Sequence, residues 1–150
     1  MTKEELFKLF HIEDLRDLPD AVMRILDGPV EARNEIYNEL IRMNDYDMSY
    51  DWFQDLYENE LSERKQKKQD FTPNSLGILC SKLTNQAGSI HEPTAGNGSM
   101  IIADWWQRCR NKIPWEHFPS QNMVTCWELS ARSIPILLLN LSIRGIMGYV

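Results

Sequence analysis

Two acids and two glycines are the residues of this sequence best suited to chemistry. Glu92 opens the stretch Glu-Pro-Thr-Ala-Gly-Asn-Gly, which ends at Gly98, and Glu128 follows further along the chain. Glycines let the backbone approach a ligand closely. One carboxylate can accept hydrogen bonds from both hydroxyls of a ribose, and another can hold a cationic group. These residue types are typical of a site for a nucleoside-bearing cofactor.

The spacing of the glycines excludes two other nucleotide sites. A phosphate-binding P-loop needs Gly-Lys-Ser or Gly-Lys-Thr after its spacer, and no lysine occurs in this stretch. The dinucleotide fingerprint needs a third glycine three positions after Gly98, where this chain has Ile101. Two glycines alone could also form an ordinary strand-to-helix turn. Glu128 could be a solvated acid at a strand end, but its apolar neighbours Trp127 and Leu129 favour a functional role.

The elements that must position these residues alternate between strands and helices. We predict strands over 89–92, 123–128 and from 148 onward, with helices over 75–83, 99–109 and from Ser130 towards Gly145. Thr72 is expected to cap the first of these helices and Ser130 the last. The strand at 123–128 is apolar enough to be buried on both faces, as parallel strands are. Both acids would then lie at the carboxyl edge of an open sheet, where ligands bind.

Residues 1–69 form a predicted all-helical segment. Apolar residues recur at helical spacing around Leu6, after Pro19, around Ile36, and in a further helix that begins after Ser49 and runs beyond residue 60. The polar run at 63–70 is interpreted as a solvated helix end or a linker, with a small basic contact to a phosphate backbone or a partner as the alternative. The predicted fold is therefore α/β, with about three parallel strands in residues 70–150 as an incomplete Rossmann-like sheet.

Charge and composition exclude several classes of protein. Residues 1–70 carry 18 Asp and Glu against 10 Lys and Arg, whereas residues 71–150 carry 4 against 6, so general electrostatic binding of a polyanion is not expected. Cys80, Cys109 and Cys126 form no CxxC pair, and the three histidines lack the spacing of metal ligands. No segment has the pattern of a signal peptide or a membrane span. We expect a cytoplasmic protein without a metal and without a membrane association.

Three stretches of residues 70–150 together resemble one known family. They are Phe71-Thr72-Pro73, the stretch from Glu92 to Gly98, and Trp127-Glu128-Leu129 followed by Asn140 and Arg144-Gly145-Ile146. In order and spacing they are similar to motifs of S-adenosylmethionine-dependent DNA N6-adenine methyltransferases. The likeness is greatest to the modification subunit of type I restriction–modification systems and its phage relatives. One departure is that Glu92 stands where the family usually has aspartate.

The resemblance implies that S-adenosylmethionine is the cofactor. The aromatic-Thr-Pro element of the family contacts the methionine part of the cofactor, and the acid that corresponds to Glu128 binds the ribose. The residues implied in cofactor binding are Phe71, Thr72, Pro73, Glu92, Pro93, Thr94, Gly96, Asn97, Gly98 and Glu128.

The catalytic element of the family is absent from this sequence. That element, Asn or Asp followed by Pro-Pro and an aromatic residue, holds the target adenine, and no Asn-Pro-Pro or Asp-Pro-Pro occurs here. We therefore expect the cofactor-binding part of a DNA adenine methyltransferase that is inactive alone and meets DNA only with other subunits or in a longer chain. The alternative is a non-catalytic interaction or regulatory module of phage origin. Either hypothesis implies a protein partner or a homo-oligomer.

Overall fold

The chain divides into two structural units, and the residues suited to chemistry belong to the second. The computed structural model describes residues 1–56, 72–84, 87–110, 112–113 and 116–150. The first unit contains Met1–Met48 and resumes at Trp52, and the second contains Ser49–Asp51 and Thr72–Val150. A tripeptide from the N-terminal part of the sequence is therefore built into the second unit.

The first unit is helical over the residues that the structure describes. Its elements are α1 (Lys3–Phe10), a short 3-10 turn (Leu15–Asp17), α2 (Leu18–Leu26), α3 (Val30–Met43) and α4 (Gln54–Leu56). A capping box starts α1, because the backbone N–H of Thr2 donates to the Glu5 carboxylate (2.8 Å) while the N–H of Glu5 donates to Thr2 Oγ1 (3.2 Å). Pro19 lies in the first turn of α2, as expected.

The predicted start of the helix after Ser49 is wrong. Trp52 and Phe53 lie in a turn, and helix begins only at Gln54. The indole N–H of Trp52 donates to the carbonyl of Asp47 (2.7 Å), which holds this turn closed. The later part of the predicted helix, the polar run at 63–70 and Phe71 lie outside the described residues.

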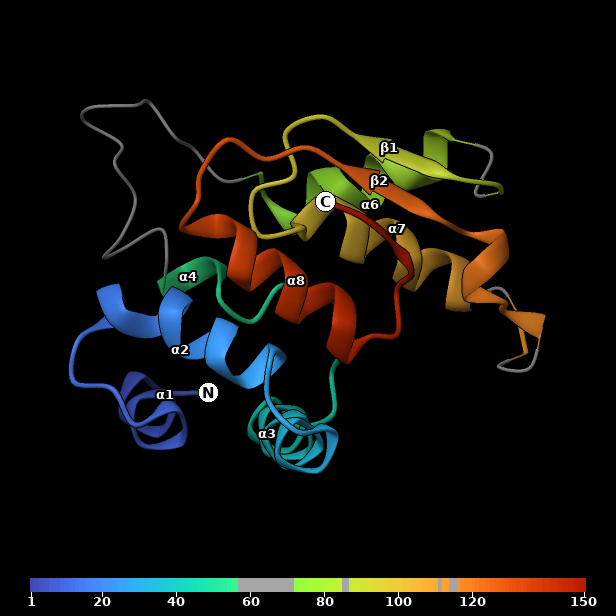
Figure 1. Ribbon diagram of the computed structural model, residues 1–150. Helices are drawn as coiled ribbons and strands as arrows, with labels where there is room; N and C mark the ends of the chain where they lie inside the picture. Colours follow the sequence, from blue (N-terminus) through green and yellow to red (C-terminus); the bar gives the residue numbers. More distant parts are fainter. Residues whose placement is uncertain (57–71, 85–86, 111, 114–115) are drawn as a thin grey trace. The chain divides into compact units, whose positions relative to one another are not determined.

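The second unit contains a three-stranded parallel sheet, which confirms the predicted β-α-β-α-β order. Its elements are α6 (Asn74–Leu83), β1 (Ile90–Glu92), α7 (Ser99–Arg110), a 3-10 turn (Pro119–Gln121), β2 (Val124–Cys126), α8 (Ser133–Ile143) and β3 (Gly148–Tyr149). The strand order is β1-β2-β3, with Glu92 opposite Cys126 and Val124 opposite Gly148. The fold class is therefore α/β (Figure 1).

The two crossover helices α7 and α8 cover the same face of the sheet (Figure 1). Their apolar side chains pack with the inward side chains of β2 in one buried cluster, which contains Ala95, Ile101, Val124, Cys126, Leu137 and Leu141. The opposite face of β2 is only half covered, because Thr125 is half-buried. The expectation that this strand is buried on both faces is therefore wrong.

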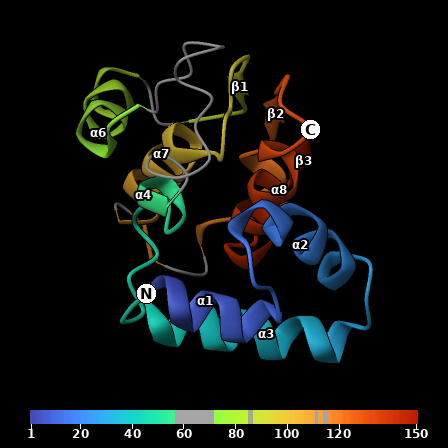
Figure 2. The same cartoon turned by 90° about the vertical axis from the view of Figure 1, so that its left-hand side faces the viewer.

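Helix α6 packs against α7, and a glycine sets the closeness of the contact (Figure 2). A Cβ atom at Gly77 would lie 2.8 Å from the Cβ of Ala103, so the two helices approach where no side chain separates them. Both predicted helix caps differ from the structure. Pro73 takes the N-cap position of α6 in place of Thr72, and α8 starts three residues after Ser130, with no side-chain cap at either helix.

Candidate functional site

The turn between β1 and α7 brings the glycines to the carboxyl edge of the sheet. The N–H of Ala95 donates to the carbonyl of Trp127 (2.9 Å), which fastens the turn to the chain that leaves β2. The N–H of Gly98 donates back to the carbonyl of Ala95 (2.8 Å), and this closes the turn. Gly96 and Gly98 have φ values of 54° and 95°, a region that side-chain-bearing residues rarely adopt. The backbone therefore requires glycines at these two positions.

Glu128 joins the carboxyl end of β2 to the glycine turn. One carboxylate oxygen accepts a hydrogen bond from the N–H of Gly96 (2.6 Å), and the other accepts one from the N–H of Ser130 (2.7 Å). The residue is half-buried. The Ser130 N–H thus fixes the acid, while the N-cap position of α8 is taken by Arg132 without a side-chain cap. Glu128 thus has a fixed direction at the sheet edge.

Glu92 ends β1 and bends towards its own loop. Its Oε1 atom accepts hydrogen bonds from the N–H of Thr94 (3.0 Å) and from the Thr94 hydroxyl (3.2 Å). No salt bridge joins Glu92 or Glu128 to a cation among the residues that the structure describes. The carboxyl edge therefore holds two carboxylates whose negative charge no side chain of the described residues compensates by an ion pair.

Two exposed apolar side chains flank Glu128 in the sequence. Trp127 is 62% exposed and Leu129 is fully exposed. The Trp127 ring meets the His91 ring edge to face, with centroids 5.0 Å apart, which ties the indole to the neighbouring strand. Large apolar side chains exposed beside a polar site are a common mark of a binding surface.

Asn97 is buried, although it lies in the glycine turn at the sheet edge. The residue is only 1% exposed, and neither its side-chain oxygen nor its side-chain nitrogen has a hydrogen-bond partner within the described part of the chain. Its backbone carbonyl accepts a hydrogen bond from Asn140 Nδ2 (2.9 Å). A buried amide without partners is costly, so this turn retains unused hydrogen-bonding capacity.

The remaining residues implied by the resemblance lie in two stretches of the chain. Pro93 and Thr94 are exposed in the loop beside Glu92. Thr72 and Pro73 precede α6 and do not line the cavity beside that helix, and Phe71 lies outside the described residues. The structure thus brings the Glu92–Gly98 turn and Glu128 together at the carboxyl edge of the sheet.

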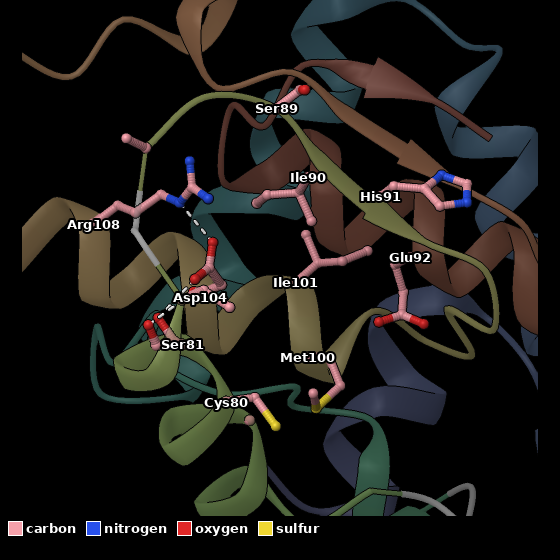
Figure 3. Close-up of a pocket in the computed structure, with 13 residues that line it drawn as sticks. Cys80, Ser81, Ser89, Ile90, His91, Glu92, Met100, Ile101, Asp104 and Arg108 are labelled. Carbon is pink, nitrogen blue, oxygen red and sulfur yellow. Dashed lines mark hydrogen bonds and ion pairs between the residues drawn. The ribbon is translucent and has the colours of Figure 1, made fainter.

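A cavity of about 290 Å³ lies between α6, β1 and α7 (Figure 3). Glu92 and Met100 lie at one end of it (Figure 3). At the other end the Arg108 guanidinium donates to Asp104 (2.6 Å), which in turn accepts from the Ser81 hydroxyl (2.7 Å). Arg108 also donates to the carbonyl of Gly88 (2.6 Å). This end of the cavity is a closed polar network, and Glu92 is the part of its wall that also belongs to the glycine turn.

Cys126 lies buried on β2 opposite Glu92. Burial raises the pKa of its thiol to about 11, and the negative charge of Glu92 adds to the effect. The thiol therefore stays protonated at neutral pH and is not suited to act as a nucleophile.

Sequence reasoning missed Asp51, which belongs to the same network as the turn. Asp51 is 4% exposed, and its carboxylate accepts hydrogen bonds from the Ser99 hydroxyl (3.2 Å) and from Asn140 Nδ2 (2.9 Å). Arg144 donates to Asn140 Oδ1 (2.9 Å) and to the carbonyl of Tyr50 (2.7 Å). The spacing of Asn140 and Arg144 was a visible signal in the sequence, but nothing around Asp51 marked it.

Comparison of the sequence with protein-family models and with curated proteins found no match to either. Within the described ranges, no helix is long and apolar enough to cross a membrane. In the same ranges, no three His, Cys, Asp or Glu residues are grouped so that they could hold a metal ion.

Proposed function

We propose that the second unit binds S-adenosylmethionine and is the cofactor-binding part of a DNA adenine-N6 methyltransferase. The observation that carries this proposal is the pair of uncompensated carboxylates, Glu92 and Glu128, held at one sheet edge by the glycine turn. S-adenosylmethionine carries a sulfonium and an ammonium group against one carboxylate, so its net positive charge suits this edge. A nucleoside triphosphate would meet repulsion there.

The residues present fit the parts of this cofactor. Glu128 is half-buried and fixed by two backbone N–H groups, an arrangement in which its remaining lone pairs can accept ribose hydroxyls. Trp127 and Leu129 offer exposed apolar surface next to it for an adenine ring. Glu92 uses one oxygen within its loop, which leaves the other for a cationic group. When bound, the cofactor would supply an electrophilic methyl group.

The methyl transfer itself is not assigned to residues of this chain. The sequence contains no Asn-Pro-Pro or Asp-Pro-Pro, and the positions it offers bind and orient a cofactor. We therefore infer that adenine recognition requires a further segment or subunit. The purified chain should bind S-adenosylmethionine and should not methylate DNA, and methyl transfer to DNA by the chain alone would contradict this division.

Calorimetry with S-adenosylmethionine tests the cofactor site. Glu128→Gln keeps the shape of the side chain and removes its charge, so we expect the affinity to fall about tenfold or more. Glu13→Gln makes the same change at an exposed position of the first unit and should leave the affinity unchanged. Equal affinities of wild type and Glu128→Gln would remove Glu128 from the site, and no binding by wild type would reject the proposed function.

A non-catalytic interaction module remains the second candidate, and one observation favours it. A groove of about 480 Å³ runs between α8 and β3 and is lined largely by apolar residues. Met147, Tyr149 and Val150 are exposed beside it. Apolar surface of this kind is typical of contact with another protein chain. Calorimetry with S-adenosylmethionine distinguishes the two, because an interaction module of this kind should lack affinity for the cofactor, and light scattering then tests whether the purified chain forms a stable oligomer.

A further inference from the structure

Asp51 lies at the start of the helix that follows the glycine turn. Its Oδ2 atom accepts a hydrogen bond from the hydroxyl of Ser99, the first residue of α7, at 3.2 Å. Its Oδ1 atom accepts one from Asn140 Nδ2 at 2.9 Å. Both carboxylate oxygens thus have hydrogen-bond partners on the helices α7 and α8. The first turn of α7 therefore has a negative charge of the chain itself beside it.

This placement matters because a glycine turn that leads into a helix normally favours anions. The backbone N–H groups of the first helical turn and the helix dipole together attract phosphate groups. Nucleotide-binding proteins use this position for the phosphates of their ligands. Here α7 has twelve residues, from Ser99 to Arg110, and follows directly after Gly98. The position would suit a phosphate if the carboxylate of Asp51 did not lie beside it.

The surrounding contacts hold the carboxylate in place. Asn140 Nδ2 donates both to Asp51 and to the backbone carbonyl of Asn97 (2.9 Å), so one amide connects the acid to the glycine turn. Arg144 fixes that amide through Asn140 Oδ1 and fixes the chain next to the acid through the carbonyl of Tyr50. All three side chains are at least nine-tenths buried. A buried charge held by such a network is screened little by solvent.

We propose that Asp51 is a specificity-determining residue that excludes phosphate-bearing ligands from the glycine turn. Its carboxylate supplies the anion that α7 would otherwise take from a ligand, and it repels a second anion at the same place. The turn is then left to nucleosides with a neutral or cationic 5′ substituent, of which S-adenosylmethionine is one. The proposal rests on the proposed function for the nature of the ligand, but the exclusion of phosphate can be tested separately.

The test compares adenosine, adenosine diphosphate and inorganic pyrophosphate by calorimetry on wild type and Asp51→Asn. We expect wild type to bind adenosine at least about tenfold more tightly than adenosine diphosphate, because a like charge opposes the phosphates. In Asp51→Asn the ratio of the affinity for adenosine to the affinity for adenosine diphosphate should fall to about threefold or less, and the variant should gain measurable affinity for pyrophosphate. Asp27→Asn, a change of the same type at an exposed position, should retain the wild-type ratio.

Several outcomes decide the proposal. A wild type that binds adenosine diphosphate as tightly as adenosine, or an Asp51→Asn variant that retains the wild-type ratio, would overturn it. If wild type binds neither S-adenosylmethionine nor adenosine, the proposed function fails, while pyrophosphate binding by Asp51→Asn alone still supports the exclusion and its absence rejects it. If Asp51→Asn does not fold, Asp51→Ser serves in its place. If neither variant folds, a wild type that binds adenosine diphosphate as tightly as adenosine still overturns the proposal.

Discussion

Asn140 Nδ2 donates a hydrogen bond to Asp51 Oδ1 at 2.9 Å, across 89 positions of the sequence. The same nitrogen also donates to the backbone carbonyl of Asn97 in the glycine turn. One side-chain amide of α8 therefore fixes both the acid beside the start of α7 and the turn that precedes this helix. The candidate site depends on this amide although Asn140 is buried and would not touch a ligand directly.

Replacing Asn140 by leucine should destabilise the second unit by about 2–4 kcal/mol. The change keeps the approximate volume but leaves the buried Asp51 carboxylate, the Asn97 carbonyl and part of Arg144 without their partner. Urea denaturation followed by tryptophan fluorescence measures the loss. Asn38→Leu on the exposed face of α3 should change the free energy of unfolding by less than about 0.5 kcal/mol. A similarly small effect of Asn140→Leu would show that the hydrogen bonds of Asn140 contribute little to the free energy of unfolding.

Replacing Arg108 by methionine should have a large effect on stability without a direct effect on the glycine turn. Arg108 and Asp104 form a buried ion pair, with side chains 5% and 14% exposed. Removal of one partner leaves a buried charge uncompensated, which costs about 3–5 kcal/mol. Thermal unfolding of Arg108→Met should therefore begin at clearly lower temperature than that of wild type. The exposed Arg24→Met is the matched control, and equal melting temperatures for both variants would contradict the prediction.

Alanine at Gly98 should cost more stability than alanine at Gly88. Both glycines have positive φ, 95° and 76°, so each substitution adds backbone strain of about 1–3 kcal/mol. A Cβ at Gly98 would also lie 2.9 Å from Leu137 Cδ1 in the core, whereas a Cβ at Gly88 would meet no atom within 4 Å. Gly98→Ala should in addition lose affinity for S-adenosylmethionine, measured by calorimetry. Equal stability and equal affinity for S-adenosylmethionine in the two variants would contradict the prediction that the close contact between Gly98 and Leu137 matters.

The three cysteines should react at different rates in the native protein. Burial, with the charge of Glu92 in addition, raises the pKa of the Cys126 thiol to about 11 from 9.0, and burial also raises the pKa of Cys109. A higher thiol pKa leaves less thiolate at pH 8, and thiolate is the reactive form. Mass spectrometry of peptides after timed N-ethylmaleimide treatment should therefore find Cys126, which is also the buried cysteine, modified more slowly than the half-buried Cys80 and Cys109. Modification of native Cys126 at the rate of Cys80 would contradict this.

The order of strands and helices in residues 89–149 could be predicted because its causes are local. Apolar runs bounded by glycines and prolines mark the strands, and apolar residues at helical spacing mark α7 and α8. Once parallel strands are assumed, Glu92 and Glu128 must lie at the same edge, and the structure places both there. The helix caps were predicted wrongly at Thr72 and Ser130. In the second case α8 begins three residues after Ser130, whose N–H donates to Glu128 outside the helix.

The sequence by itself indicated the acids and glycines of the turn and its place between a strand and a helix, because these follow from neighbours along the chain. Only the tertiary structure decided that Asp51 lies beside the first turn of α7, since its partners Ser99 and Asn140 are 48 and 89 positions away. It also decided that Asn97 is buried. Hydrogen bonds over such separations form only when the chain has folded, and they leave no local pattern in the sequence. The position of Asp51 therefore could not be predicted from the glycine motif, although the proposed role of this acid is to set the charge beside the first turn of α7.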